Sequence, residues 1–132
     1  MRINNQNYVE FAENAILSAK NKKNEKRETI GLPTTSQIRN ILAMTSDVYN
    51  DVVNNTAETL SEKEISRIQY LRIRIIYEHG RDKKEGPVKN FIDQSKILDD
   101  LKEIGNSKEN FILFARYMEA LVAFHKFYGG RD

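Results

Sequence analysis

The chain has 132 residues and a net charge of +2, with 39% hydrophobic and 30% charged side chains. This balance is typical of a globular chain long enough to bury a core without metals or disulfides. The absence of cysteine excludes disulfides, cysteine-ligated zinc and a cysteine nucleophile. No apolar run is long enough for a membrane span, and none at the N-terminus suggests a signal peptide, so we expect a cytoplasmic protein with no membrane partner.

The first expected helix runs from about Asn5 to Lys20, because its apolar residues follow a three-four spacing. These residues are Tyr8, Phe11, Ala12, Ala15, Ile16 and Ala19. A polar linker follows over about residues 21–33, with a strongly basic stretch from Lys20 to Arg27. It is either a solvated loop or a loop that touches RNA.

The second and third expected helices both begin with a capping-box pattern. Thr34 precedes Gln37 by three residues, and Ser61 precedes Glu64 in the same way. We expect the second helix to end at residues 54–55. The third should run to about His79, with Gly80 as a left-handed C-cap.

The fourth expected helix begins near Pro87 and continues to about Ile104, where Gly105 ends it. The fifth begins at Asn106 or Ser107 and reaches about Tyr128. Because it is apolar on nearly all sides, it must be central or shared with another chain. The sequence therefore predicts an all-α, compact bundle of about five helices, forming a single helical domain over residues 1–132.

Three arginines of the third helix recur every seven residues, namely Arg67, Arg74 and Arg81. At about 100° per residue they form one stripe, which Tyr70 and Tyr77 flank. Guanidinium groups bind phosphates bidentately, and tyrosines stack on bases, so the stripe suits a nucleic-acid backbone. Residues 67–89 carry seven basic and three acidic side chains. The alternative is a solvated face with intrahelical ion pairs.

Arg72 points instead toward the apolar side of the third helix. A buried arginine needs a carboxylate or an interface, so Arg72 forms either an internal salt bridge or a contact with another subunit.

Signals for an enzyme are weak. His79 and His125 lack a metal-ligand spacing, and there is no phosphate-binding loop or serine nucleophile motif. The carboxylate pairs Asp47/Asp51 and Asp99/Glu103 recur four residues apart, which is common on solvated faces. We therefore expect no enzymatic activity, no catalytic residue, no metal and no cofactor.

Several sequence strings, taken together and in order, resemble one family. They are residues 34–42 (TTSQIRNIL), residues 70–81 (YLRIRIIYEHGR), residues 88–91 (VKNF) and residues 114–130 (FARYMEALVAFHKFYGG). From about residue 33 to the C-terminus, the chain resembles the small subunit of the type III-A CRISPR (Csm) effector complex. The part before residue 33 matches only loosely.

The resemblance implies a non-catalytic, RNA-binding scaffold used in antiviral defence. Several copies would stack along the duplex of CRISPR RNA and target RNA, beside the backbone and large subunits. It implies RNA contacts from these basic side chains: Arg39, Arg74, Arg81, Lys89, Arg116 and Lys126. Arg67 joins this set only because of its place on the arginine stripe.

Two other functions stay open. One is a helical adaptor that binds only proteins, through its last helix. The other is a small metal-dependent enzyme, which would require carboxylates such as Asp47 and Asp99 to converge in space.

Overall fold

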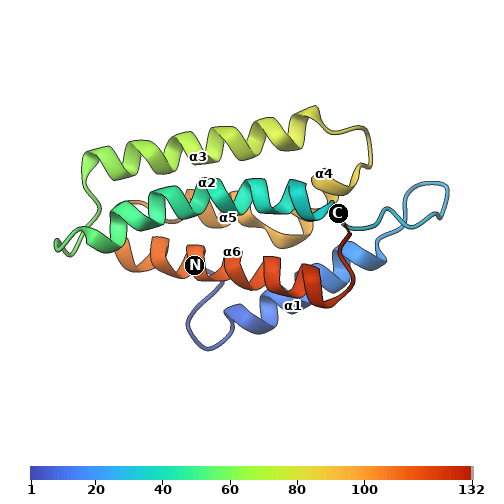
Figure 1. Ribbon diagram of the computed structural model, residues 1–132, viewed down its shortest axis with the longest axis horizontal. Coiled ribbons are helices and arrows are strands. Elements are labelled where there is room, and N and C mark those ends of the chain that lie inside the picture. The colour runs from blue at the N-terminus through green and yellow to red at the C-terminus, as the bar shows by residue number, and fades with distance from the viewer. Residues whose placement is uncertain (132) are drawn as a thin grey trace.

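The computed structural model describes residues 1–131 and contains six helices (Figure 1). They are α1 (Tyr8–Asn21), α2 (Thr35–Asn54), α3 (Glu62–Arg81), α4 (Pro87–Ser95), α5 (Ile97–Lys102) and α6 (Lys108–Phe127). Extended pairing within residues 1–131 is limited to two isolated bridges, Lys23 with Thr29 and Thr59 with Ser107. The expected all-α bundle is confirmed.

Helix α6 lies at the centre of the bundle, between α1 and α2 (Figure 1). Its buried side chains include Phe111, Phe114, Tyr117, Met118 and Leu121. Helix α3 packs on α2, and α4 and α5 close the bundle against α1 and α3. The apolar character of the last helix is therefore explained largely inside this chain, since its neighbours bury it.

The helix expected from Pro87 to Ile104 is divided, so the bundle has six helices instead of about five. Lys96 adopts a left-handed conformation (φ 59°) between α4 and α5. The break leaves the Ser95 carbonyl outside the helical ladder. It accepts hydrogen bonds from Arg2 Nη2 (2.5 Å) and Tyr117 Oη (2.7 Å), which satisfy this buried acceptor.

The expected end of α3 was wrong by two residues. Gly80 is not a left-handed cap, because α3 continues to Arg81 and Asp82 follows it in extended conformation. The Lys89 ammonium, from α4, donates to the carbonyls of His79 (2.9 Å) and Asp82 (2.8 Å). A cation on the last carbonyls supplies the cap that glycine would otherwise help to form.

Four of the five expected helix starts are confirmed, whereas α1 begins at Tyr8 and not at about Asn5, because residues 5–7 form a turn. Thr34 and Ser61 form complete capping boxes, Pro87 is the first residue of α4, and the Ser107 hydroxyl accepts from the backbone of Asn110. None of the helices in residues 1–131 combines the length and apolar character needed to cross a membrane.

Candidate nucleic-acid interface

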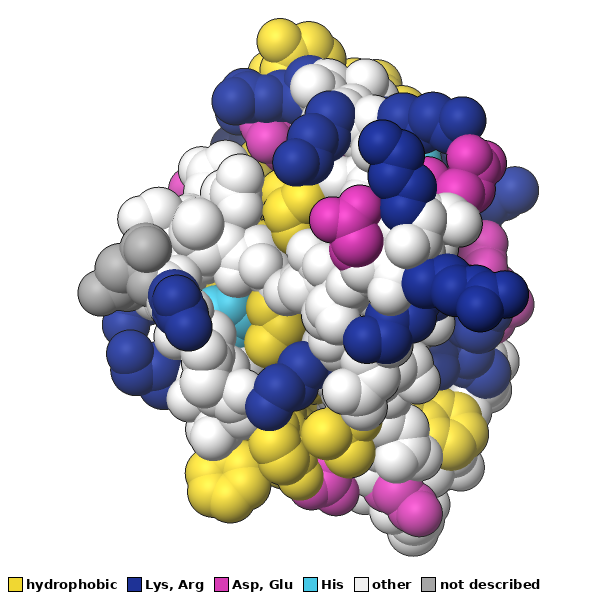
Figure 2. All heavy atoms as spheres, turned by 90° about the vertical axis from the view of Figure 1, so that its right-hand side faces the viewer, with side chains coloured by type: hydrophobic (Ala, Val, Ile, Leu, Met, Phe, Trp, Pro, Cys, Tyr) yellow, Lys and Arg dark blue, Asp and Glu magenta, His cyan; other side chains and the backbone are white. Residues whose placement is uncertain are grey.

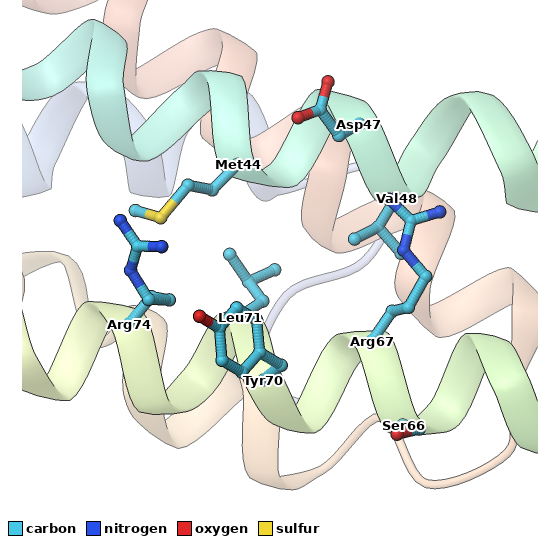
Figure 3. Close-up of a pocket in the computed structure, with 8 residues that line it drawn as sticks. All are labelled: Met44, Asp47, Val48, Ser66, Arg67, Tyr70, Leu71 and Arg74. Carbon is cyan, nitrogen blue, oxygen red and sulfur yellow. The ribbon is translucent and has the colours of Figure 1, made fainter.

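The arginine stripe of α3 lies on the surface of the bundle. The adjoining side of the helix is buried through Ile68, Leu71 and Ile75. As Figure 3 shows, Arg67 and Arg74 extend from α3 toward α2. The regular spacing read from the sequence therefore produces a line of cations along the border between these two helices.

The three arginines of the stripe are not equally available. The Arg67 guanidinium forms an ion pair with Asp51 of α2, and its side chain is 33% exposed. Arg74 lies 5.9 Å from the centre of the Tyr70 ring. Arg81 is 62% exposed and lies 3.7 Å from the Glu78 carboxylate, beyond good hydrogen-bonding distance. Arg74 and Arg81 are therefore both exposed, whereas the charge of Arg67 is already paired with Asp51.

A groove of about 490 Å³ runs between α2 and α3 beside this stripe (Figure 3). Met44 and Val48 line it from α2, and Leu71 lines it from α3. The α3 wall also includes Ser66, Arg67, Tyr70 and Arg74, and the Asp47 carboxylate lines the groove from α2. The groove combines an apolar floor with an aromatic ring and a guanidinium, which are groups that can contact a base and a phosphate.

A second basic surface lies at one end of the bundle, where three segments meet. We call it the basic end and define it as residues 20–39, 78–93 and 125–131. These segments carry twelve lysine and arginine side chains against six aspartates and glutamates. Figure 2 views the molecule from this end and shows the basic side chains spread over the face. The remaining described residues carry nine basic against twelve acidic side chains, so the charge is strongly polarised.

Hydrogen bonds between the three segments hold the basic end together. The Asn90 amide donates to the Ala19 carbonyl (2.8 Å), and the Thr35 backbone N–H donates to the Arg131 carbonyl (2.6 Å). The buried His125 ring donates through Nε2 to the Pro33 carbonyl (2.6 Å). These contacts join α1, α2, α4 and the C-terminal turn, and so fix the cations of distant segments on one surface.

The basic linker is part of this surface. The backbone N–H of Glu25 donates to the Glu85 carboxylate (3.0 Å), and the Lys84 ammonium lies 3.6 Å from the Glu25 carboxylate. The linker therefore lies against the turn between α3 and α4. Its side chains Lys22, Lys23, Lys26 and Arg27 are all exposed.

The predicted contact residues fall into three groups. Arg39 and Lys126 are exposed at the basic end, where Arg81 also lies. Lys89 belongs to the same end, but its ammonium group already forms two of its three possible hydrogen bonds with backbone carbonyls. Arg116 lies apart, in a hollow lined also by Lys108 and other residues of the bundle's far end.

Sequence reasoning missed one feature of the basic end. Lys20 and Arg131 line a hollow of about 610 Å³ together with Tyr128, and the Lys20 ammonium lies 5.8 Å from the centre of the Tyr128 ring. These residues stand more than a hundred positions apart in the chain. The local sequence carries no signal for this meeting, which depends on the packing of α1 against α6.

The histidines and carboxylates of the described residues are dispersed over the bundle. Among residues 1–131, no group of three or more histidines and carboxylates is placed to hold a metal ion. His79 Nε2 lies 2.9 Å from Asp93, at the surface. Burial raises the pKa of Asp100 to about 6 against the opposing effect of Arg2, but this carboxyl is 1% exposed and points into the bundle. What the surface offers is clustered positive charge.

The fold and surface thus define a small, all-helical protein with a strongly basic end and a cationic groove. Comparison with known proteins identifies its family. Residues 6–131 match the Csm2 type III-A family, and the chain belongs to it.

Individual relatives agree. The chain is 42% identical over 132 residues to the CRISPR system Cms protein Csm2 of Streptococcus thermophilus, covering 98% of both chains. It is 36% identical over 99 residues to the protein of that name from Mycobacterium tuberculosis strain H37Rv, covering 75% of this chain and 77% of the relative. The Enterococcus italicus protein is 39% identical over 97 residues, covering 72% and 67%. The resemblance inferred from the sequence strings is confirmed.

Proposed function

We propose that this chain is a non-catalytic, RNA-binding scaffold subunit of a type III-A CRISPR effector complex. Several copies stack along the duplex of CRISPR RNA and target RNA, next to the backbone and large subunits. Membership of the Csm2 type III-A family supports the assignment to the complex. The observation that carries the RNA contact is the concentration of twelve basic side chains at one end of the bundle, continuous with the arginines of α3.

The contact we propose is with phosphates and sugars, without reading of sequence. Exposed cations bind the backbone of any RNA, and their contribution falls as salt rises, because binding releases counterions. Base pairing between the two RNAs supplies the specificity. We assign the principal contacts to Arg39, Arg74, Arg81 and Lys126, which are free of strong ion pairs within residues 1–131.

We expect three other predicted residues to contribute less to RNA binding. Arg67 shares its charge with Asp51, and Lys89 retains a single ammonium proton for an external acceptor. Arg116 contacts RNA only if a strand also passes over the α6 side of the bundle. Four of the twelve cations of the basic end belong to the basic linker and are exposed, so they can contact the RNA as well.

The test is the salt dependence of target RNA binding by the assembled complex carrying Arg74→Ala and Arg81→Ala together. Each lost phosphate contact lowers the slope of log K against log salt by about 1, so each copy of the double variant should lower it by about 2 where both residues touch RNA. Affinity at low salt should fall as well.

Two control variants separate charge from geometry. Arg74→Lys with Arg81→Lys keeps both charges and should retain most of the slope. Lys102→Ala removes an exposed cation from the last turn of α5, which is part of neither basic surface, and should leave the slope unchanged. If the double alanine variant and Lys102→Ala gave the same affinity and slope as the unmodified complex, the α3 stripe would not be part of the RNA interface.

A further inference from the structure

The outer face of α3 carries an exposed apolar ridge that RNA binding does not explain. Tyr70, Ile73, Ile76 and Tyr77 are exposed by 59%, 59%, 46% and 60%. They are four of the eight large hydrophobic side chains that are exposed in residues 1–131. Their spacing of three and four residues places them on one side of the helix, and we call them the α3 ridge.

Exposed apolar groups gathered on one helix face mark an interaction site more often than scattered ones do. The two isoleucines decide which kind of partner fits. Isoleucine offers no hydrogen bond and no aromatic ring, so it gains little from phosphate, sugar or an unstacked base. Buried against apolar side chains of a protein, each isoleucine would instead be removed from water.

Arg72 supplies an independent indication beside the ridge. It lies four residues before Ile76, and its Nε atom is buried without a hydrogen-bond partner in the described structure. No carboxylate of residues 1–131 forms an ion pair with it. The internal salt bridge considered for Arg72 is therefore not formed. The side chain is only partly buried, so its guanidinium charge, unpaired within the described residues, is available to a carboxylate outside this chain. This favours the other interpretation of Arg72, a contact with another subunit.

We propose that the α3 ridge is the docking site for a different protein subunit of the effector complex. The occupant is an amphipathic helix whose apolar side chains cover Ile73 and Ile76 and whose carboxylate pairs with Arg72. This inference rests on the proposed function in one respect, that the chain is a subunit of such a complex. It assigns the ridge to protein and leaves the basic end and the arginine stripe to RNA. Tyr70, which lines the α2–α3 groove as well as the ridge, lies at the boundary between the two contacts.

A second copy of the chain fits the ridge poorly. Two ridges facing each other would bring the arginines on both edges of α3 together, and like charges at an interface oppose association. The other exposed hydrophobic side chains within the described helices do not form a stripe that could cover the ridge. Val9 is on α1, Val53 on α2 and Phe127 on α6.

The first test places p-benzoylphenylalanine at position 73 of the chain within the assembled complex, followed by irradiation and mass spectrometry. The expected product joins this chain to another protein subunit, at an amphipathic helix that carries acidic residues beside its apolar face. Cross-links to RNA or to a second copy, or no cross-link at all, would overturn the assignment.

The second test measures incorporation of variants into the complex. Ile73→Ser with Ile76→Ser should weaken incorporation at least tenfold, because truncating central apolar contacts of an interface costs about that much. Val9→Ser with Val53→Ser is a matched control of similar exposure on other helices, 48% and 43%, and should incorporate normally. Thermal melts of both free variants check their folding.

The outcomes distinguish the two proposals. If the unmodified chain and the control both fail to assemble with the other subunits, the proposed function fails. If both assemble and the ridge variant assembles equally well, the ridge assignment fails while the proposed function stands.

Discussion

Replacing Asp82 with alanine should destabilise the corner between α3 and α4, on which the basic end is built. The Asp82 carboxylate accepts hydrogen bonds from the backbone N–H groups of Val88 (2.9 Å) and Lys89 (3.0 Å), in the first turn of α4. It also accepts one from Lys83 (3.0 Å). The carboxylate thus caps α4, because the N-cap residue Gly86 has no side chain to do so.

The expected loss follows from these contacts. A lost N-cap costs about 1 kcal/mol, and a carboxylate at a helix N-terminus adds about 0.3–1 kcal/mol. Hydrogen bonds to a charged acceptor are worth about 1.5–3 kcal/mol each, but those that share one carboxylate do not add fully. We expect a total loss of about 2–3 kcal/mol. At about 2.1 cal/mol/K of unfolding entropy per residue, this lowers Tm by about 7–11 °C.

The assay is thermal unfolding followed by circular dichroism at neutral pH, with urea unfolding as a second measure. Asp47→Ala is the matched control, since Asp47 is an exposed aspartate without an ion pair in the described structure, and it should change Tm by less than about 2 °C. Asp82→Asn keeps an oxygen acceptor and should lose less than Asp82→Ala. A Tm for Asp82→Ala equal to that of the control would refute the capping role.

Three further predictions concern ionisable side chains. Burial raises the pKa of Asp100 from 3.8 to about 6 in the folded protein, so the protonated carboxyl stabilises the fold below about pH 4 and this stabilisation is lost as pH rises through 6. When the pH is lowered from 7 to 4, the free energy of unfolding of the unmodified chain should therefore rise by up to roughly 3 kcal/mol relative to that of Asp100→Asn, as measured from paired unfolding curves. Lys89→Met should lower Tm by several degrees but lower the RNA salt slope less than Arg81→Ala does, and the opposite ranking would make Lys89 chiefly an RNA contact. In a double-mutant cycle, Arg67→Ala and Asp51→Ala should couple by no more than about 1 kcal/mol, because both side chains are partly exposed; stronger coupling would contradict the surface location of this pair.

Local signals predicted much of the fold. The capping boxes at Thr34 and Ser61 and the proline at the start of α4 use interactions within four residues, and all three are present as expected. The break at Lys96 could not be predicted in this way, because apolar periodicity continues through it. It depends on Arg2 and Tyr117, which reach Ser95 from distant parts of the chain.

In the candidate site, too, local features could be predicted from the sequence, whereas contacts between distant parts of the chain could not. The seven-residue spacing of Arg67, Arg74 and Arg81 correctly indicated that they share one side of α3. Their spacing could not show that Asp51, on another helix, forms an ion pair with the Arg67 guanidinium. Nor could it show that the Lys89 ammonium caps α3, since a cation near a helix end has the same sequence signature whether it faces RNA or a carbonyl.

The exposure of apolar residues on α3 could not be predicted from the sequence pattern either. Ile75 is fully buried whereas Ile76, the next residue, is 46% exposed, because the neighbouring helices cover only part of the circumference of α3. Helical periodicity assigns directions around the axis but not the extent of the neighbouring elements. That extent decides whether an apolar residue belongs to the core or to an interface.

Photocross-linking of the assembled complex to RNA that carries photoreactive thiouridine tests the central claim most directly. The account predicts that nucleotides attach to peptides of α3 and of the basic end, residues 20–39, 78–93 and 125–131. Peptides of the α5 region, residues 97–107, should stay free. Attachment concentrated on residues 97–107, with α3 and the basic end unmodified, would contradict the claim that these cations hold the RNA.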